Sequence, residues 1–393
     1  MFRSLQTLRN SGNVALLLTV SVGWLLSLGI RIVYPVLLPD IMTEFGMRFT
    51  GGGALLSALW ISYALMQFPA GILADRFGEQ SVLLASLGLG GAAAVLIVAA
   101  PAFALFAVAT VLLGVGTGLF GPSRVTVLSD VFPDQRNTAI SFSQAAGNAG
   151  NALLPIAAGM IAVAFGWRYG FGYLLPGFLL TFVGVALFVP SRTSAAPTSE
   201  SGGAYLRTLR RVVGEPPVLY ATAILFCLLF YYQGITGFLP TYLLETKGLS
   251  QSAVSVVYGG FFAAAIGLQF LAGAAADRYG ERRAVAGFVA AGFVGAAALP
   301  FAEGAVPVVG AVLLSASILG AIPPANTNIV LQLPDSMQGS GYGLLRSVYI
   351  GLGATAPPII GRLGDAGALD AGVLLAAVVA LGAVVGCYGQ PDP

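Results

Sequence analysis

Apolar residues run through this chain in long continuous stretches that are separated by short polar segments. A membrane-spanning helix needs roughly 20 mainly apolar residues, and we predict twelve such helices, near residues 14–38, 51–74, 80–100, 103–128, 138–164, 170–190, 218–239, 251–276, 284–302, 305–330, 340–361 and 368–388. The stretches do not alternate apolar with polar positions, which excludes a membrane β-barrel. The pattern therefore predicts an all-α membrane protein.

One polar segment is longer than the others and divides the predicted helices into two sets of six. Residues 191–217 are rich in Ser, Gly and Pro and become basic toward their end, as expected of a connector between domains. We predict an N-terminal six-helix bundle over residues 1–190, a cytoplasmic linker over 191–217 and a C-terminal six-helix bundle over 218–393. The first stretch has no small-residue cleavage pattern behind it, so we interpret it as a helix rather than a signal peptide.

The composition supports the membrane assignment and limits the kinds of metal, cofactor or catalytic site that we expect. Hydrophobic residues make up 57% of the chain and charged residues 9%, against about 25% charged residues in soluble domains. The chain has no His, and its two cysteines, Cys227 and Cys387, stand alone in predicted helices. We therefore expect no metal and no cofactor. Without a nucleophile–base pair or a metal cluster, we do not expect an enzyme.

Basic residues predict the orientation. Eleven Arg residues fall on the side of the two termini, whereas four basic residues fall on the other side: Arg48, Arg168, Lys247 and Arg362. Cytoplasmic loops carry the excess of Lys and Arg. We expect a multi-pass protein of the cell membrane with both termini in the cytoplasm.

A thirteen-residue segment occurs twice. Residues 67–79 read QFPAGILADRFGE and residues 269–281, 202 positions later, read QFLAGAAADRYGE, with nine identical positions. Gly118 and Pro122 match Gly320 and Pro324 at the same distance. Six helices thus match six in the same order. Because six is even, the halves share one orientation, which predicts a pseudo-two-fold axis along the membrane normal.

The duplicated segment resembles the signature that the major facilitator superfamily carries between helices 2 and 3. The matching residues are Gly71 to Gly78 (GILADRFG) and Gly273 to Gly280 (GAAADRYG). The resemblance implies a secondary transporter with a central site between two six-helix bundles, which works by alternating access. Thr110 stands where proton-linked members of the family often carry an Arg, which weakens the case for proton coupling.

The same segments predict a cytoplasmic gate. Glycines at 71 and 273 permit close helix approach, and those at 78 and 280 permit a sharp turn. Asp75 lies at a helix C-terminus, where the dipole disfavours an anion, so it needs a partner. Asp130 and Arg136 resemble charges that the family carries near the loop between helices 4 and 5. The predicted gate comprises Gly71, Asp75, Arg76, Gly78, Asp130, Arg136, Gly273, Asp277, Arg278 and Gly280. Alternatively, the Asp-Arg pairs only anchor helix ends at the headgroups.

Three arginines lie within predicted helices, at Arg31, Arg124 and Arg346, and no Asp or Glu lies in the middle of one. Buried ionisable groups in a membrane mark functional sites, and a guanidinium matches a carboxylate or phosphate. We predict that Arg31 and Arg346, one from each half, bind an anionic substrate. Arg124, which matches Asn326 in the other half, either lines the path or snorkels to the surface.

Polar and aromatic residues at helical spacing accompany the arginines. The predicted substrate-binding residues are Arg31, Tyr34, Tyr63, Gln67, Gln144, Asn148, Tyr232, Gln233, Gln269, Asn326, Arg346 and Tyr349. Each has a simpler alternative, because amides also bond helix to helix and aromatic side chains also pack.

The leading hypothesis is a transporter of a small, carboxylate-like organic anion. The alternative is an exporter of hydrophobic or cationic compounds, and a third reading is a non-transporting, transporter-like sensor. We expect a monomer that binds a small anionic molecule and the lipid bilayer and no nucleic acid. A coupling ion or counter-anion, facilitated diffusion and Na⁺ use all stay open.

Overall fold

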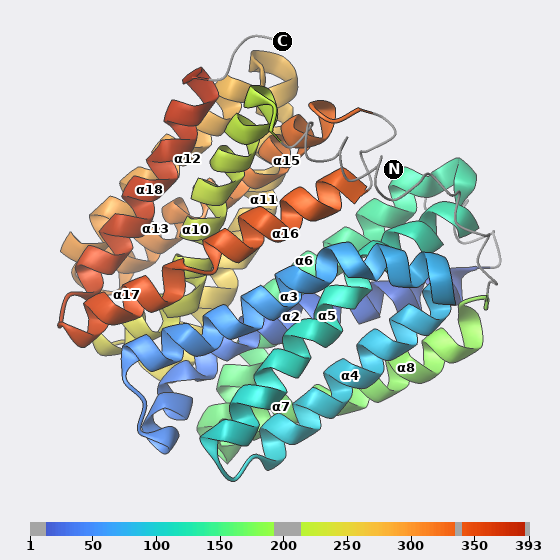
Figure 1. Ribbon diagram of the computed structural model, residues 1–393. Coiled ribbons are helices and arrows are strands. Elements are labelled where there is room, and N and C mark those ends of the chain that lie inside the picture. Colours follow the sequence, from blue (N-terminus) through green and yellow to red (C-terminus); the bar gives the residue numbers. More distant parts are fainter. Residues whose placement is uncertain (1–12, 192–213, 335–339, 390–393) are drawn as a thin grey trace. The chain divides into compact units, whose positions relative to one another are not determined.

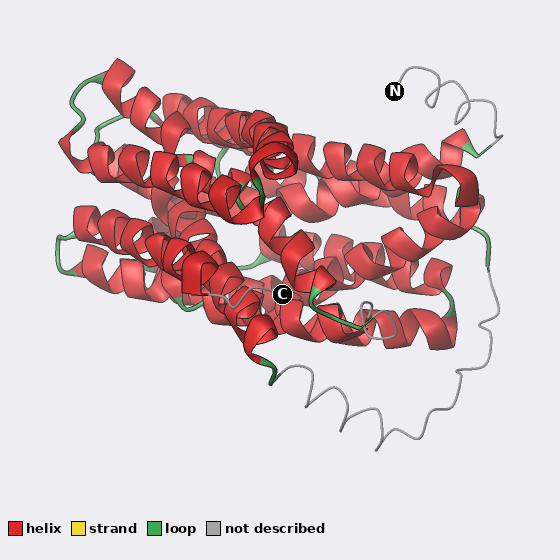
Figure 2. Ribbon diagram, turned by 90° about the horizontal axis from the view of Figure 1, so that it is seen from above, coloured by secondary structure: helices red, strands yellow, loops and turns green. Residues whose placement is uncertain are grey.

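The computed structural model describes residues 13–191, 214–334 and 340–389. Within these ranges the chain forms helices joined by short loops and no strand, as Figure 2 shows. The predicted all-α fold is confirmed.

The first half of the sequence forms its six predicted helices (Figure 1). They are α2 (Val14–Phe45), α3 (Phe49–Phe77), α4 (Glu79–Ala99), α5 (Phe103–Val131), α6 (Arg136–Phe165) and a broken sixth helix made of α7 (Tyr169–Gly172) and α8 (Leu175–Phe188). A short 3₁₀ turn, η1 (Pro133–Gln135), leads into α6.

The second half repeats this order with more breaks. Its helices are α10 (Pro216–Glu245), α11 (Gln251–Tyr279), α12 (Glu281–Ala298) with the 3₁₀ turn η2 (Leu299–Phe301), α13 (Ala305–Ser315), α14 (Ser317–Gly320), α15 (Ile322–Leu331), α16 (Ser340–Gly353), α17 (Ala356–Asp365) and α18 (Leu369–Gly389). Pro lies in the first turn of α15 and of α17, where its missing N–H leaves no helical hydrogen bond unmade.

Eleven helical segments in the described part of the chain are long and apolar enough to cross a membrane. The remaining predicted span, residues 340–361, forms α16 and α17. Two predicted helix ends, at Leu38 and Leu239, are wrong: α2 continues to Phe45 and α10 to Glu245. A proline inside a membrane helix removes only one donor, and neighbouring segments compensate for it, so Pro39 and Pro240 do not end these helices.

The chain forms two compact units. The first unit consists of Met1–Leu37 and Ala58–Thr198, and the second unit of Leu38–Ser57 and Ser199–Pro393. The end of α2 and the start of α3 therefore belong to the second unit although they come from the first half of the sequence. The predicted bundles of 1–190 and 218–393 stay a prediction, and most of the predicted linker, residues 192–213, lies outside the described residues.

Candidate functional site

Arg31 is a buried cation held between aromatic rings in the first unit. Its side chain is 2% exposed, and its Nε donates a hydrogen bond to the Ser27 carbonyl at 3.0 Å. The guanidinium carbon lies 3.8 Å from the ring centre of Tyr63 and 5.0 Å from that of Trp60. Among the described residues, the Nη2 nitrogen has no hydrogen-bond partner. The predicted role of Arg31 in substrate binding stays a prediction.

Tyr34, predicted on the same helix face, bonds to α5. Its hydroxyl lies 2.9 Å from the Thr110 hydroxyl, which in turn donates to the Phe106 carbonyl at 2.8 Å. The ring packs edge-on against Phe171 at 4.7 Å. Thr110 of α5 thus helps to hold the hydroxyl of Tyr34 in α2. A substrate role for Tyr34 stays a prediction.

Arg124 is buried in the first unit and does not snorkel. It is 4% exposed, and its guanidinium carbon lies 4.5 Å from the ring centre of Trp24. The Gln144 side-chain oxygen accepts from Arg124 Nη2 at 3.4 Å and from Trp24 Nε1 at 3.3 Å. Gln144 then donates to the Asn148 side-chain oxygen at 3.2 Å. The structure therefore joins α2, α5 and α6 through one polar network.

Gln67 forms a hydrogen bond between two helices, which is the simpler alternative to a role in substrate binding. It is 5% exposed, and its Nε2 donates to the Gly118 carbonyl at 3.1 Å. This bond joins α3 to α5, as amides often do between membrane helices.

In the second unit, Asn326 accepts hydrogen bonds from two tyrosine hydroxyls. Its side-chain oxygen accepts from Tyr342 at 2.8 Å and from Tyr349 at 2.9 Å, while its amide nitrogen donates to the Ile322 carbonyl at 3.0 Å. The guanidinium carbon of Arg346, which is half-buried, lies 6.0 Å from the ring centre of Tyr342. The structure thus brings together three predicted site residues from α15 and α16.

The other predicted residues of this unit lie on α10 and α11. Gln233 is fully buried and donates to the Ile350 carbonyl at 2.9 Å, which joins α10 to α16. Tyr232 is half-buried with its ring edge toward Phe262, and Gln269 is half-buried. Their roles in substrate binding stay predictions.

The two predicted gate segments adopt the same local arrangement. Gly78 and Gly280 have φ of +80° and +85°, so the predicted sharp turns are confirmed. The Asp75 and Arg76 pair is exposed, as is its repeat, and each Arg lies over the aromatic ring that follows it, at 5.3 Å and 5.2 Å.

The charge network predicted around Asp75 also includes Asp130 and Arg136, which are both exposed. The network stays a prediction. The same holds for the second-half pair, Asp277 and Arg278.

Close helix approach at the gate glycines Gly71 and Gly273 stays a prediction. Within the described residues, no neighbouring segment comes within 4 Å of the place where a Cβ would stand on Gly71 or Gly273. Close helix approach occurs instead at Gly118 and Gly320, where a Cβ would stand 2.8 Å from the Tyr63 carbonyl oxygen and 3.1 Å from the Leu268 carbonyl oxygen respectively. The helices cross there, nearer the middle of each span.

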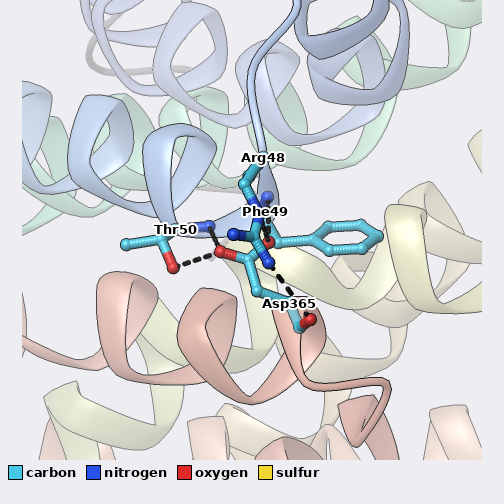
Figure 3. Close-up of polar contacts among 4 residues, drawn as sticks. All are labelled: Arg48, Phe49, Thr50 and Asp365. Carbon is cyan, nitrogen blue, oxygen red and sulfur yellow. Dashed lines mark hydrogen bonds and ion pairs between the residues drawn. The ribbon is translucent and has the colours of Figure 1, made fainter.

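Sequence reasoning missed a polar cluster at the start of α3, drawn in Figure 3. The Asp365 carboxylate, at the end of α17, accepts from the Phe49 N–H at 2.8 Å, the Thr50 N–H at 3.2 Å and the Thr50 hydroxyl at 2.5 Å. Arg48 Nε lies 3.7 Å from the same carboxylate. Asp365 therefore caps α3 across more than 300 residues of sequence, and we call this cluster the Asp365 cap. Local sequence carries no signal for such a contact.

The surroundings of Asp365 lower its pKa. Burial alone raises the pKa of this carboxyl, but the hydrogen bonds from Thr50 and Phe49 and the charge of Arg48 outweigh burial, so the pKa lies below its ordinary value of 3.8. The carboxyl is therefore ionised at neutral pH. Nearby, Ser57 donates to the Ala354 carbonyl, and a Cβ on Gly53 or on Gly361 would clash with backbone of the facing segment. The start of α3 thus packs closely on the break between α16 and α17 and on α17.

The names of the curated relatives mention several different small molecules. A hexuronate transporter of Bacillus subtilis is 26% identical over 229 residues, which cover 56% of this chain and 54% of that protein. This chain thus spans about half the length of that relative. The "Probable sulfoacetate transporter SauU" of Cupriavidus necator is 24% identical and covers 92% of this chain and 90% of its own. The fosmidomycin resistance protein of Escherichia coli is 23% identical, with coverage of 88% and 85%.

Solved structures share the fold. A bacterial homologue of the human lysosomal transporter Spinster, in an inward-facing and occupied conformation, superposes with a TM-score of 0.77 at 15% identity and covers 95% of each chain. A D-xylose–proton symporter gives 0.76 at 14% identity, with coverage of 93% of this chain and 97% of its own. The family profile of the Major Facilitator Superfamily matches residues 19–358. With the duplicated signature and the helical fold, this match shows that the chain is a multi-pass membrane transporter of the major facilitator superfamily.

Proposed function

We propose that this transporter carries a small organic anion whose charged group binds Arg31. The observation that carries the proposal is the burial of this guanidinium at 2% exposure with an Nη2 nitrogen that lacks a hydrogen-bond partner among the described residues. A buried donor that is left unsatisfied destabilises a protein by about 1–3 kcal/mol, and by more when it is charged. A carboxylate supplies both the missing acceptor and the missing negative charge.

The aromatic neighbours favour binding at the guanidinium edge. Tyr63 and Trp60 lie against Arg31 at 3.8 Å and 5.0 Å, and such contacts stabilise a cation through the ring faces. Because a guanidinium donates in its plane, rings on its face hold it without using its N–H groups. Two parallel N–H groups then match the two oxygens of a carboxylate.

Arg346 is proposed as an anion ligand within the second unit. It lies by Tyr342, whose hydroxyl is held by Asn326 together with that of Tyr349. The shared acceptor keeps both tyrosines in place, so they supply a fixed polar wall beside the guanidinium. Arg346→Gln is expected to weaken anion uptake less than Arg31→Gln, because Arg346 is only half-buried.

Relatives support both anion transport and its alternative. Hexuronate and sulfoacetate are organic anions, and the transporters named for them match this chain. The fosmidomycin resistance protein matches it as well. Resistance to a drug is consistent with its export, so that relative supports a second candidate function of the drug-efflux type.

Uptake by proteoliposomes tests the proposal. A thermal-shift screen of the purified protein against lactate, oxalate and a hexuronate first identifies the anions that bind, because a ligand of the folded state raises its apparent stability. Arg31→Gln is expected to reduce uptake of such an anion at least tenfold. Arg283→Gln, which removes one exposed charge, serves as the matched control and is expected to leave uptake unchanged.

The opposite results are equally clear. Uptake that survives Arg31→Gln unchanged contradicts anion binding at Arg31. Transport of a cation or a neutral apolar compound that no anion inhibits favours the exporter instead.

A further inference from the structure

We propose that Tyr63 is a positioning residue, which gives the Arg31 site a preference for anions with two coplanar oxygens, such as carboxylates, over spherical anions. This inference rests on the proposed function and deepens it. The sequence predicted a role for Tyr63 in substrate binding, and the contact of its ring with Arg31 specifies that role. Tyr63 acts on the anion through the guanidinium.

The hydrogen bond within α2 fixes only part of the Arg31 side chain. Nε donates to the Ser27 carbonyl, about one turn earlier, at 3.0 Å. A single hydrogen bond sets the direction of one N–H group but lets a planar guanidinium turn about that bond. The outer nitrogens, Nη1 and Nη2, carry the remaining donors, so a second contact is needed to hold them in one orientation.

The Tyr63 ring supplies this second contact. The guanidinium carbon of Arg31 lies 3.8 Å from the ring centre, which is van der Waals contact, and both side chains are buried. Trp60 lies farther from the guanidinium, at 5.0 Å, and its ring is almost perpendicular to that of Tyr63, with centres 5.8 Å apart. Tyr63 therefore restricts the turning of the guanidinium about its Nε bond.

The backbone of Tyr63 is itself held by the crossing of α3 and α5. A Cβ on Gly118 would stand 2.8 Å from the Tyr63 carbonyl oxygen, and one on Gly114 would stand 2.5 Å from the Leu59 carbonyl oxygen. After Tyr63, Gln67 donates to the Gly118 carbonyl at 3.1 Å. The ring thus belongs to a helix segment that α5 contacts closely about one turn before and one turn after it.

A guanidinium held in one orientation distinguishes anions by shape. Its parallel N–H groups match the two oxygens of a carboxylate, whereas a chloride ion accepts from any direction and gains little from a fixed fork. If the guanidinium can turn, it still attracts both anions, but the carboxylate must also order the side chain. Ordering a long side chain weakens binding about two- to tenfold. Tyr63 therefore raises the affinity for carboxylates more than the affinity for chloride.

The ratio of the dissociation constants for chloride and for a carboxylate tests the inference. Acetate, lactate and glucuronate each carry one charge, as chloride does, and are compared with it by thermal-shift titration of the purified full chain with their sodium salts. We expect at least one of them to bind the wild type about tenfold or more tightly than chloride. Tyr63→Leu should lower this ratio about two- to tenfold, and Tyr63→Phe, which keeps the ring, should retain it.

Further variants separate orientation from charge and from folding. Arg31→Lys keeps the charge but has no planar fork, so in this background Tyr63→Leu should change the ratio less than about twofold. Tyr388→Leu, at an exposed tyrosine of α18, is the matched control and should leave the ratio unchanged. Both constants are measured on the same folded protein, so a smaller folded fraction does not alter their ratio. If Tyr63→Leu does not fold, Tyr63→Met carries the comparison.

The outcomes distinguish this inference from the proposed function. The inference fails if the wild type prefers no carboxylate to chloride, if Tyr63→Leu leaves the ratio unchanged, or if Tyr63→Phe lowers it equally. It also fails if Tyr63→Leu has the same effect on the ratio beside Lys as beside Arg at position 31. In each of these cases, loss of anion uptake in Arg31→Gln still supports the proposed function. If no carboxylate binds and Arg31→Gln leaves uptake unchanged, the proposed function fails as well.

Discussion

The starts of α3 and α11 occupy equivalent places in the repeat but are capped in different ways. The 202-residue offset relates Phe49, the first residue of α3, to Gln251, the first of α11. Ser250 precedes α11, and its hydroxyl accepts from the Ala253 N–H at 3.3 Å. Arg48 stands at the matching position before α3 and offers no acceptor from its side chain, so Asp365 of α17 supplies the cap.

The difference shows how a duplicated fold becomes asymmetric. Both helix starts need an acceptor for their first N–H groups, and α11 carries its own. Helix α3 depends on a residue more than 300 positions away, so the same requirement also attaches it to α17. Because the cap of α3 comes from Asp365 rather than from a residue next to the helix, the start of α3 also makes a tertiary contact with α17.

Removal of the distant cap should have the largest effect. Asp365→Ala deletes three hydrogen bonds to a carboxylate that is 13% exposed. We expect the free energy of unfolding to fall by about 1.5–3 kcal/mol, the range for hydrogen bonds to charged groups. Thermal unfolding in detergent measures it, with Glu303→Ala at an exposed acid as the control. Equal stability of the two variants would contradict the cap.

Acid should weaken the same contact. The folded-state pKa of Asp365 lies below 3.8, so its contribution to stability is fully present above the pKa of the unfolded chain, near 4, and is lost as pH falls through the folded-state value. Between pH 5 and pH 3 the wild type should therefore lose more stability than Asp365→Asn. Parallel pH profiles for the two proteins would show that Asp365 does not titrate with folding.

A local cap should replace the distant one. Arg48→Ser gives α3 the residue that α11 has at its equivalent place. In the Asp365→Ala background it should restore about 0.5–2 kcal/mol, the usual effect of an N-cap serine. The measurement is again thermal unfolding, and Arg48→Gln in the same background is the control. Recovery by both variants would mean that removal of the Arg48 charge, and not the cap, is responsible.

The smallest effect is expected at the other helix start. Ser250→Ala removes a single, exposed 3.3 Å hydrogen bond and should reduce stability by about 0.5–1 kcal/mol. Its effect should add to that of Asp365→Ala within about 0.5 kcal/mol, as for sites without a shared partner. A larger interaction energy in the double variant would show that the two helix starts are coupled.

The ion pair contributes less to this contact than the caps do. Arg48 is 76% exposed and lies 3.7 Å from Asp365, and exposed ion pairs typically stabilise by about 0–1 kcal/mol. The charge of Arg48 therefore matters less than the N–H groups beside it.

The sequence predicted those features of the fold that depend on hydrophobic periodicity and mean hydropathy. All twelve helical stretches and the duplicated turns at Gly78 and Gly280 followed from local patterns. The ends of α2 and α10 did not, because proline stops a helix in water more strongly than in a packed membrane bundle. Local patterns also did not predict the Asp365 cap or the contact between the Arg124 guanidinium and the Trp24 ring. Each depends on side chains from separate helices, which no local pattern records.

The buried guanidinium of Arg31 has an electrical consequence under the proposed function. If a carboxylate binds Arg31, the loaded site is nearly neutral, whereas the empty site carries one positive charge. A membrane potential of 100 mV acts on one charge with about 2.3 kcal/mol over the full field. The potential then affects the empty transporter more than the loaded one, so exchange of one anion for another is expected to be faster than one-way transport.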